Sequence, residues 1–189
     1  MPWILVIGGI VGIVGSFILT YDKLQLSTNP NFVPNCNLNP IVSCGSVLSS
    51  NEGSIFGFPN SLMGLAVFAV FITIGMAMLA GAKFKRWFWL SLQGGTIFAV
   101  LFVHWLFYHS VYTINALCPY CISVWVVVIT TFIYVSFYNV DQGYWKLFPR
   151  YKKFYSWKRR HHLDILIAWL VIIGLLILKH FWYYYGHYF

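Results

Sequence analysis

The chain of 189 residues is 60% hydrophobic and only 8% charged, and it has a formal net charge of +8. Roughly a quarter of the residues in a soluble domain are charged, so this composition excludes a water-soluble globular protein and indicates one integral membrane domain. The positive charge does not indicate nucleic-acid binding, because ten of the twelve Lys and Arg residues lie in two short segments, Lys83–Arg86 and Lys146–Arg160.

Five apolar runs are long enough, or nearly so, to cross a bilayer core about 30 Å thick. They are Trp3–Tyr21, Ser61–Ala82, Trp87–His109, Pro119–Val140 and Leu163–Tyr185. The fifth is the weakest, because its uninterrupted apolar stretch Ile165–Leu178 has only 14 residues. Only helices or a closed barrel satisfy the backbone inside a membrane, and continuous apolar runs are typical of helices. We predict an all-α integral membrane protein, with a four-helix transmembrane bundle in residues 1–140 and a fifth transmembrane helix in residues 163–189.

The two basic segments predict the orientation in the membrane. Lys83–Arg86 connects the second run to the third, and the basic loop 141–162 connects the fourth to the fifth. Basic connections stay on the cytoplasmic side, near anionic lipid. We therefore expect the N-terminus in the cytoplasm, and residues 22–60, residues 110–118 and the C-terminus on the outer side. The first run lacks a basic segment before it and a convincing cleavage site, so we interpret it as a retained span.

The outer loop 22–60 has no charged residue between Leu24 and Asn51, and it contains four prolines with many Asn and Ser residues. Loops of this length within a compact domain are usually functional. We predict that the loop folds over the outer mouth of the bundle and contains a short helix near Ser43–Ser50.

The chain has four cysteines, two in the outer loop (Cys36 and Cys44) and two in a CPYC motif (Cys118 and Cys121). The predicted topology places all four on the outer side, where disulfides form if the compartment is oxidising. Two structural disulfides would explain them, and so would a zinc site with four thiolates. However, a CxxC closes too small a ring to stabilise a fold much and suits a cycling dithiol. Structural zinc sites usually pair two short CxxC motifs, whereas one gap here has seven residues.

The position of the CPYC motif favours redox chemistry. Pro119 suits the first turn of a helix, which places Cys118 at the helix N-terminus, where unpaired amides favour a thiolate. Cys121 follows about one turn deeper, toward the apolar zone. Soluble thioredoxin-like proteins also use such a motif, but after a β-strand that is absent here. The pattern predicts electron transfer between protein thiols and an oxidant dissolved in the bilayer.

Several motifs together resemble the vitamin K epoxide reductase family, most closely its bacterial branch. They are Cys36-x7-Cys44 with the following Val47–Ser50, the stretch Phe56–Gly64, and the later CPYC, and the resemblance covers residues 1–140. It implies a four-helix core that reduces a quinone at the CxxC and oxidises a thioredoxin-like protein through the loop pair.

The resemblance also implies an order for the relay. A reduced partner attacks a Cys36–Cys44 disulfide at Cys36, and the released Cys44 attacks Cys118. This opens a Cys118–Cys121 disulfide, and the Cys121 thiolate passes electrons to the quinone. Each step is a reaction that a CxxC supports.

Three further residues are assigned by the resemblance to the quinone site. Asn60 matches the family residue that hydrogen-bonds a quinone carbonyl, and Ser50 matches a hydroxyl residue near the site. Trp125 stands where vertebrate members have a tyrosine that binds the second carbonyl, and an indole N–H could donate instead. The acceptor would be a quinone of the ubiquinone, menaquinone or vitamin K type, and no metal is expected.

Some bacterial members carry a thioredoxin-like domain after a fifth span. Residues 163–189 contain the fifth span but no such domain. We therefore expect a separate thioredoxin-like partner on the outer side. The predicted function is a membrane thiol:quinone oxidoreductase that generates disulfides. The alternatives are a vitamin K epoxide or quinone reductase driven by thiols, and a non-catalytic membrane protein with structural disulfides or zinc. A bacterial disulfide oxidase of another type fits less well, because its CxxC follows the first span.

Two histidines of the third run are further candidates. A histidine inside a membrane is a functional hypothesis by default. We expect His104 to hydrogen-bond within the bundle, and His109 to lie at the outer interface, where it is a candidate for proton delivery.

Overall fold

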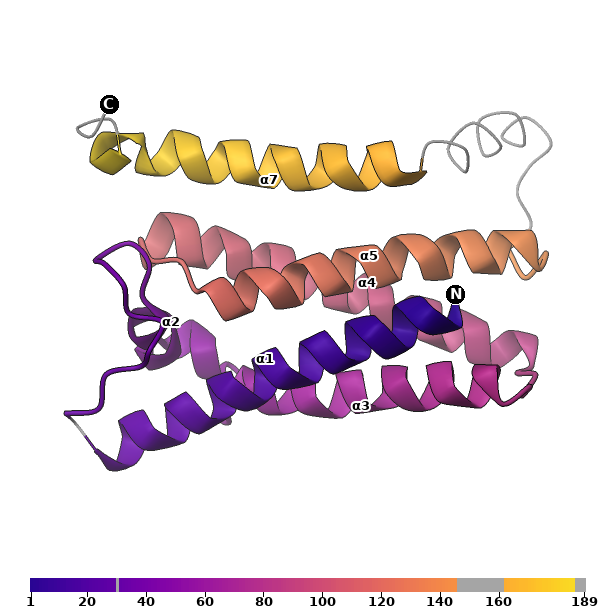
Figure 1. Ribbon diagram of the computed structural model, residues 1–189. Coiled ribbons are helices and arrows are strands. Elements are labelled where there is room, and N and C mark those ends of the chain that lie inside the picture. Colours follow the sequence, from indigo (N-terminus) through magenta and orange to yellow (C-terminus); the bar gives the residue numbers. More distant parts are fainter. Residues whose placement is uncertain (30, 146–161, 186–189) are drawn as a thin grey trace.

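The structure is a computed structural model that describes residues 1–29, 31–145 and 162–185. In these ranges, long helices run side by side along one axis (Figure 1). They are α1 (Pro2–Thr28), α3 (Asn60–Leu79), α4 (Arg86–Tyr108), α5 (Pro119–Asp141) and α7 (His162–Tyr185). Short elements lie between them: helix α2 (Cys44–Ser49), the 3-10 turn η1 (Asn51–Ser54) and the π-helical turn η2 (His109–Thr113).

Five helices in the described ranges are long and apolar enough to cross a membrane, which confirms the predicted all-α membrane fold. The predicted bounds hold within a few residues except at the end of α1, which continues to Thr28 instead of stopping near Tyr21. The apolar run stops at Asp22, but a polar residue ends a membrane span without ending a helix, and no Gly or Pro follows within the helix. In the added turns, Leu26 packs against the buried cluster that contains the loop cysteines.

Helices α1 and α3 approach closely because glycines face the neighbouring helix. A Cβ added at Gly12 of α1 would collide with the ring of Phe68 on α3, and one added at Gly75 of α3 would collide with Val6 on α1. Small residues of this kind let two backbones approach in a membrane, where packing drives helix association. Phe68 is almost fully buried in the resulting core.

A buried polar network fixes α4 against α5 near the start of α4. The amide of the fully buried Asn139 donates to Gln93 Oε1 over 3.0 Å and to the Trp89 carbonyl over 3.3 Å. The Gln93 amide donates in turn to Ser136 Oγ over 3.0 Å. Hydrogen bonds between helices are a common means of helix association in lipid. This network lies at the end of the bundle opposite to the CxxC.

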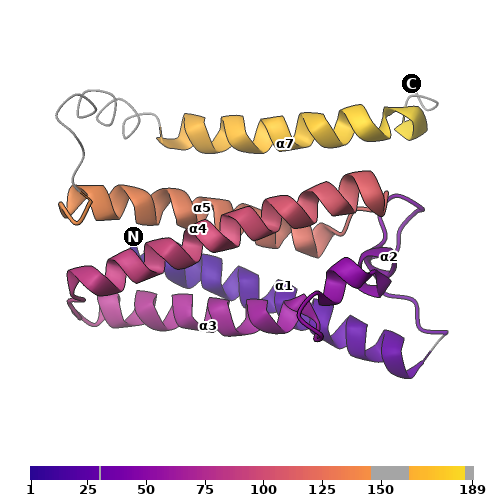
Figure 2. The same ribbon diagram turned by 180° about the vertical axis from the view of Figure 1, so that it is seen from behind.

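Helix α7 lies along α5 at the edge of the bundle (Figures 1 and 2). The Trp169 indole N–H donates to His104 Nε2 over 3.0 Å, while His104 Nδ1 lies 2.8 Å from the Val100 carbonyl. Both ring nitrogens are therefore satisfied in a neutral imidazole with its proton on Nδ1. The prediction that His104 hydrogen-bonds within the bundle is confirmed.

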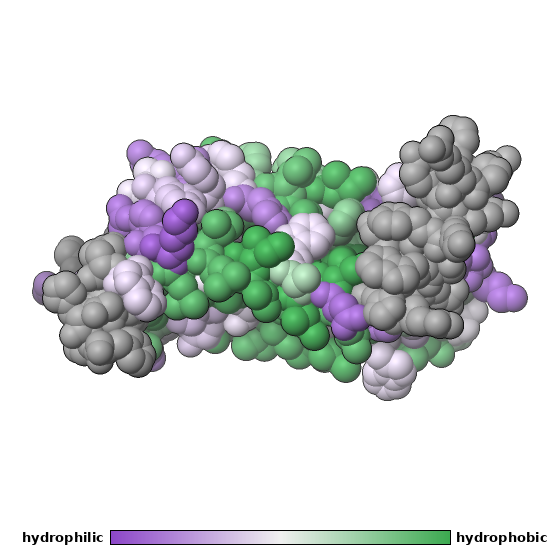
Figure 3. Space-filling view, turned by 90° about the horizontal axis from the view of Figure 1, so that it is seen from above, coloured by the Kyte–Doolittle hydropathy of each residue, from purple (hydrophilic) through white to green (hydrophobic). Residues whose placement is uncertain are grey.

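The basic and the cysteine-containing segments lie at opposite ends of the molecule. The α3–α4 connection with Lys83 and Lys85 lies at the end where α5 finishes and α7 begins, and α2 and the start of α5 lie at the other end (Figure 1). Between the two ends the visible surface is mainly apolar (Figure 3). The predicted orientation also concerns Lys146–Arg160 and the C-terminal residues 186–189. Both segments lie outside the described residues.

Candidate active site

The outer loop folds over one end of the bundle through α2 (Figure 2), as predicted. Ser43 begins this helix, and its hydroxyl accepts a hydrogen bond from the Ser46 N–H over 3.2 Å. Such caps satisfy one of the free N–H groups of a helix start. At the other end of α2, Lys23 Nζ donates to the Leu48 carbonyl, which joins the loop to α1.

Asn37 connects the two halves of the loop. Its Oδ1 accepts a hydrogen bond from the Gly45 N–H over 2.9 Å and another from the Ser43 hydroxyl over 3.2 Å. Asn37 follows Cys36 and Gly45 follows Cys44, so these contacts hold the two cysteines close together. In the structure they form a disulfide, with their Cα atoms 5.6 Å apart.

A pair of backbone hydrogen bonds joins the loop to the segment before α5. The Leu117 N–H donates to the Ile41 carbonyl over 2.6 Å, and the Ser43 N–H donates to the Leu117 carbonyl over 3.0 Å. Together they form a short parallel β-bridge. Cys44 follows Ser43 and Cys118 follows Leu117, so the bridge brings the two cysteine segments together in one cluster.

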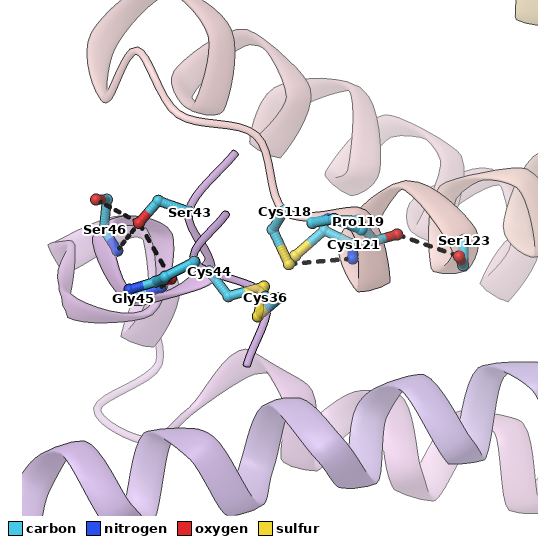
Figure 4. The surroundings of a disulfide bond; sticks show 10 residues. Cys36, Ser43, Cys44, Gly45, Ser46, Cys118, Pro119, Cys121 and Ser123 are labelled. Atoms are coloured by element: carbon cyan, nitrogen blue, oxygen red, sulfur yellow. Dashed lines mark hydrogen bonds between the residues drawn. A yellow bond between two sulfur atoms is a disulfide. The ribbon is translucent and has the colours of Figure 1, made fainter. Parts of the chain in front are cut away.

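Cys118 packs against the loop disulfide (Figure 4). Cys36, Cys44 and Cys118 share one buried cluster, which Leu19 and Leu48 complete. Cys44 and Cys118 are 0% exposed, whereas Cys36 is 7% exposed. The structure thus places a thiol and a disulfide in the same buried cluster, and thiol–disulfide exchange needs these two groups near each other.

Cys118 is the N-cap of α5, as the position of Pro119 predicted, and its Sγ accepts the Cys121 N–H over 3.3 Å. The hydrogen bond from the Cys121 side chain lowers the pKa of the Cys118 thiol, and the N–H groups of Cys121 and Tyr120 lower it further, while burial opposes them. The pKa therefore lies below the ordinary value of a thiol. A lower pKa gives Cys118 more thiolate, the nucleophilic form.

We expect Cys118 to react with a small alkylating reagent at a lower pH than an ordinary cysteine. The thiolate is the reactive form, so a lowered pKa keeps the rate high as the pH falls through the range where a free thiol becomes protonated. Mass spectrometry of the reduced protein across pH measures this profile, with the denatured chain as control. A half-maximal rate at or above about pH 8.5, where a free cysteine is half ionised, would contradict the lowered pKa.

An apolar cavity of about 510 Å³ adjoins the cysteine cluster and shares Leu19 and Leu48 with it. Most of its wall comes from α3 and α4, and the remainder from α1, α5 and the outer loop. Cys121, Asn60 and Trp125 are all lining residues. A mainly apolar cavity of this size with a few polar groups is typical of a small-molecule site.

Asn60 and Trp125 place polar groups in this wall. Asn60 Nδ2 donates to the Glu52 carbonyl over 2.6 Å, and Asn60 Oδ1 is buried without a hydrogen-bond partner among the described residues. A buried polar atom without a partner usually has a reason, such as a ligand. Trp125 is 6% exposed, and its ring meets that of Phe107 edge to face at 5.6 Å.

The sequence matches the vitamin K epoxide reductase family over residues 3–136. The chain belongs to this family. That range spans helices α1 to α5 and holds all four cysteines, and it makes the protein a membrane oxidoreductase of a family whose chemistry links thiols and disulfides to quinones. No curated protein matches the chain closely enough for a further comparison.

Ser50, which the resemblance to the vitamin K epoxide reductase family assigned to the quinone site, lies outside the cavity wall that the described residues form. Its hydroxyl donates to the Val47 carbonyl over 2.8 Å, and Val47 is itself a lining residue. Ser50 therefore contacts the wall and not the cavity.

Two residues that shape this vitamin K epoxide reductase site were not found from the sequence. Glu52 orients Asn60 through its backbone carbonyl, and Leu117 positions Cys118 through the β-bridge. Backbone contacts of this kind leave no pattern in residue types. Asn37 had a usable signal, because a short polar side chain in a turn-rich segment is a frequent hydrogen-bonding partner of nearby backbone.

His109 lies 3.8 Å from the Glu52 carboxylate, and both side chains are 25% exposed. It therefore lies at the end of the bundle that holds the cysteines, and the expectation that this end faces the outer side stays a prediction. Among the residues that the structure describes, no group of three or more His, Cys, Asp or Glu side chains is arranged to hold a metal ion.

Proposed function

We propose that this protein is a membrane thiol:quinone oxidoreductase that forms disulfides in a thioredoxin-like partner and reduces a membrane quinone. The position of the CxxC is the observation that supports this most directly. Cys118 packs against the loop disulfide, while Cys121 lines the apolar cavity. The CxxC dithiol thus lies between the loop disulfide, which can exchange with protein thiols, and a cavity that can hold a lipid-soluble acceptor.

In the proposed relay, the electrons first reach the CxxC by thiol–disulfide exchange. The partner's thiolate bonds to Cys36, and Cys44 leaves as a thiolate. Cys44 then bonds to Cys118 and displaces Cys121 from an oxidised CxxC. The partner's second thiol attacks the partner sulfur bonded to Cys36, so the partner leaves with a disulfide. Cys36 finally attacks Cys44, which restores the loop disulfide and leaves Cys118 and Cys121 as thiols.

The CxxC dithiol then gives two electrons and two protons to the acceptor and becomes a disulfide again. A quinone supplies the two-electron acceptor and is released as a quinol. The lowered pKa of Cys118 favours its participation as a thiolate.

The polar groups of the cavity suit the two carbonyls of a quinone ring. Asn60 uses one amide hydrogen on Glu52 and has a second one for a carbonyl, and its free Oδ1 suits a quinol hydroxyl. We assign the second carbonyl to the Trp125 indole, and to Ser50 the support of the wall through Val47. Ubiquinone, menaquinone and vitamin K all have these two carbonyls, so the arrangement fits a quinone ring of any of the three types.

We propose that the tail of a quinone leaves the cavity between α3 and α4. Val67 and Val70 on α3 and Phe98 on α4 line the cavity, and they are 36%, 52% and 55% exposed on helices long enough to span the membrane. A tail leaving between α3 and α4 would enter lipid directly.

We place the Lys83–Arg86 connection in the cytoplasm and the cysteines on the outer side.

The test is a quinone-reduction assay on the purified protein, with a reduced thioredoxin-like protein as donor. We expect turnover in the wild type and none in Cys118→Ala. Ser123→Ala is the matched control, because this exposed hydroxyl lies nearby on α5 and donates only to the Pro119 carbonyl. Folded wild-type protein that reduces none of several quinones with several donors would overturn the proposal in favour of structural disulfides.

Two exposed apolar side chains lie on either side of Cys36, and we expect them to contact the partner. Val33 is 66% exposed and Leu38 is 74% exposed, in a segment without charged residues. Replacing both by Asp should raise the KM for a protein donor by roughly tenfold, because apolar contacts are lost at the docking surface. The KM for dithiothreitol, which needs no docking surface, should stay unchanged.

Asn31→Asp controls for the added charge, since it alters the same loop without removing an apolar side chain. Steady-state kinetics with both donors give the comparison. If the double Asp variant and the wild type share one KM for the protein donor, the partner binds elsewhere.

A further inference from the structure

The outer end of α7 contacts the segment that leads to the CxxC. His180 Nε2 lies 2.8 Å from Asn115 Oδ1, a hydrogen bond in which the ring N–H donates. The ring of Tyr112 also meets the His180 ring, at 4.8 Å. Helix α7 is therefore joined to the bundle three residues before Cys118.

Apolar packing supports the same contact. Phe181, next to His180, is 0% exposed. It belongs to the same hydrophobic cluster as Val111 and Leu117, which lie in the same short segment. Leu117 is the residue that forms the β-bridge to the outer loop.

Asn115 is the point where this segment turns. Its φ of 55° lies in the left-handed region. Among the described residues, Asn115 is the one non-glycine residue with a positive φ. Asn tolerates this region better than most residues, though at a cost in energy. Two bonds between Ser110 and Ala116 close the turn, one from the Ser110 hydroxyl to the Ala116 carbonyl and one from the Ala116 N–H to the Ser110 carbonyl. The direction in which the chain enters Cys118 thus depends on this turn.

We infer that α7 is a positioning element for the CxxC, and that His180 acts through Asn115 to keep Cys118 in reach of Cys44. His180 touches none of the reacting sulfur atoms, so it is a positioning residue. The inference rests on the relay proposed above, since it concerns the exchange between Cys44 and Cys118. It gives the fifth helix a role that needs no fused domain.

The test uses the Cys121→Ala protein, in which Cys36 and Cys118 compete for Cys44. The ratio of the Cys44–Cys118 bridge to the Cys36–Cys44 bridge, measured by mass spectrometry after acid quenching, reports how well Cys118 is placed. Adding His180→Leu should lower this ratio by roughly tenfold, because small displacements of reacting groups have large effects. His180→Gln, which keeps a donor for Asn115, should restore it.

Asn115→Gly gives an independent second variant, because Gly accepts the left-handed backbone but removes the side-chain acceptor. It should lower the ratio as His180→Leu does, and the two changes together should have no larger effect than either alone. Trp169→Phe is the matched control, since it removes the hydrogen bond of α7 to His104 and leaves the outer end intact.

The assay contains neither quinone nor partner, so its outcome is separate from that of the turnover assay. A ratio unchanged by both His180→Leu and Asn115→Gly, or lowered as much by Trp169→Phe, would overturn this inference and leave the relay standing. If Cys121→Ala alone forms no Cys44–Cys118 bridge, the relay and the inference fail together.

Discussion

Replacing Cys121 by alanine is expected to abolish quinone reduction and to trap a disulfide between Cys44 and Cys118. Cys118 then has no second thiol in its motif, while Cys44 lies beside it in the same buried cluster. The cavity also loses the thiol that lines it. Removing a group that acts directly on the substrate typically lowers turnover by on the order of 10³-fold or more. Non-reducing peptide mapping identifies the bridge, and the quinone assay on the same sample gives the turnover.

Cys36→Ala separates the two halves of the relay. This variant should lose turnover with a protein donor, because the partner has no cysteine to attack, but it keeps the CxxC dithiol, which should still reduce one equivalent of quinone in a single turnover. A Cys121→Ala protein in which only Cys36–Cys44 is found would show that Cys44 is not the cysteine that exchanges with the CxxC.

Asn60→Ala should lower quinone turnover by about 10- to 100-fold and change the KM for the protein donor little. The amide is a hydrogen-bonding group in a mainly apolar wall, and such groups are strongest where water is excluded. In the proposed relay the protein donor engages Cys36, which does not line this cavity. Measuring kcat and KM separately for quinone and donor tests the prediction.

Thr73→Val on the same helix is the control, because its exposed hydroxyl donates only to the Ala69 carbonyl and lines no part of the cavity. Thermal unfolding of both variants checks the fold, since Asn60 also binds the Glu52 carbonyl. Quinone kinetics identical to those of the wild type would remove Asn60 from the site.

The sequence predicted the features that depend on residue type along one helix. Inside a membrane a continuous apolar run forms a helix, because a helix satisfies its own backbone, so the spans were predictable. Pro119 marked the start of α5, with Cys118 as its cap. What it did not predict depends on backbone atoms of distant segments. The bridge at Leu117 is one such contact, and the bond from Asn60 to the Glu52 carbonyl is another.

The fifth helix shows the same division. Its existence followed from hydropathy, but its contacts did not, because Trp169 and His180 are also the residue types expected at a membrane surface. Only the folded chain pairs them with His104 and Asn115. The continuation of α1 past Tyr21 was missed because hydropathy reports the membrane boundary and not the helix boundary.

The burial of Cys118 has a consequence for the reductants that the proposed relay can use. Since this thiol is 0% exposed and lies in one buried cluster with the loop cysteines, dissolved thiols reach the CxxC less readily than they reach an exposed cysteine. In the proposed relay, electrons enter through the loop disulfide, so a donor must engage Cys36 first. The loop would then keep the membrane quinone from oxidising dissolved thiols directly.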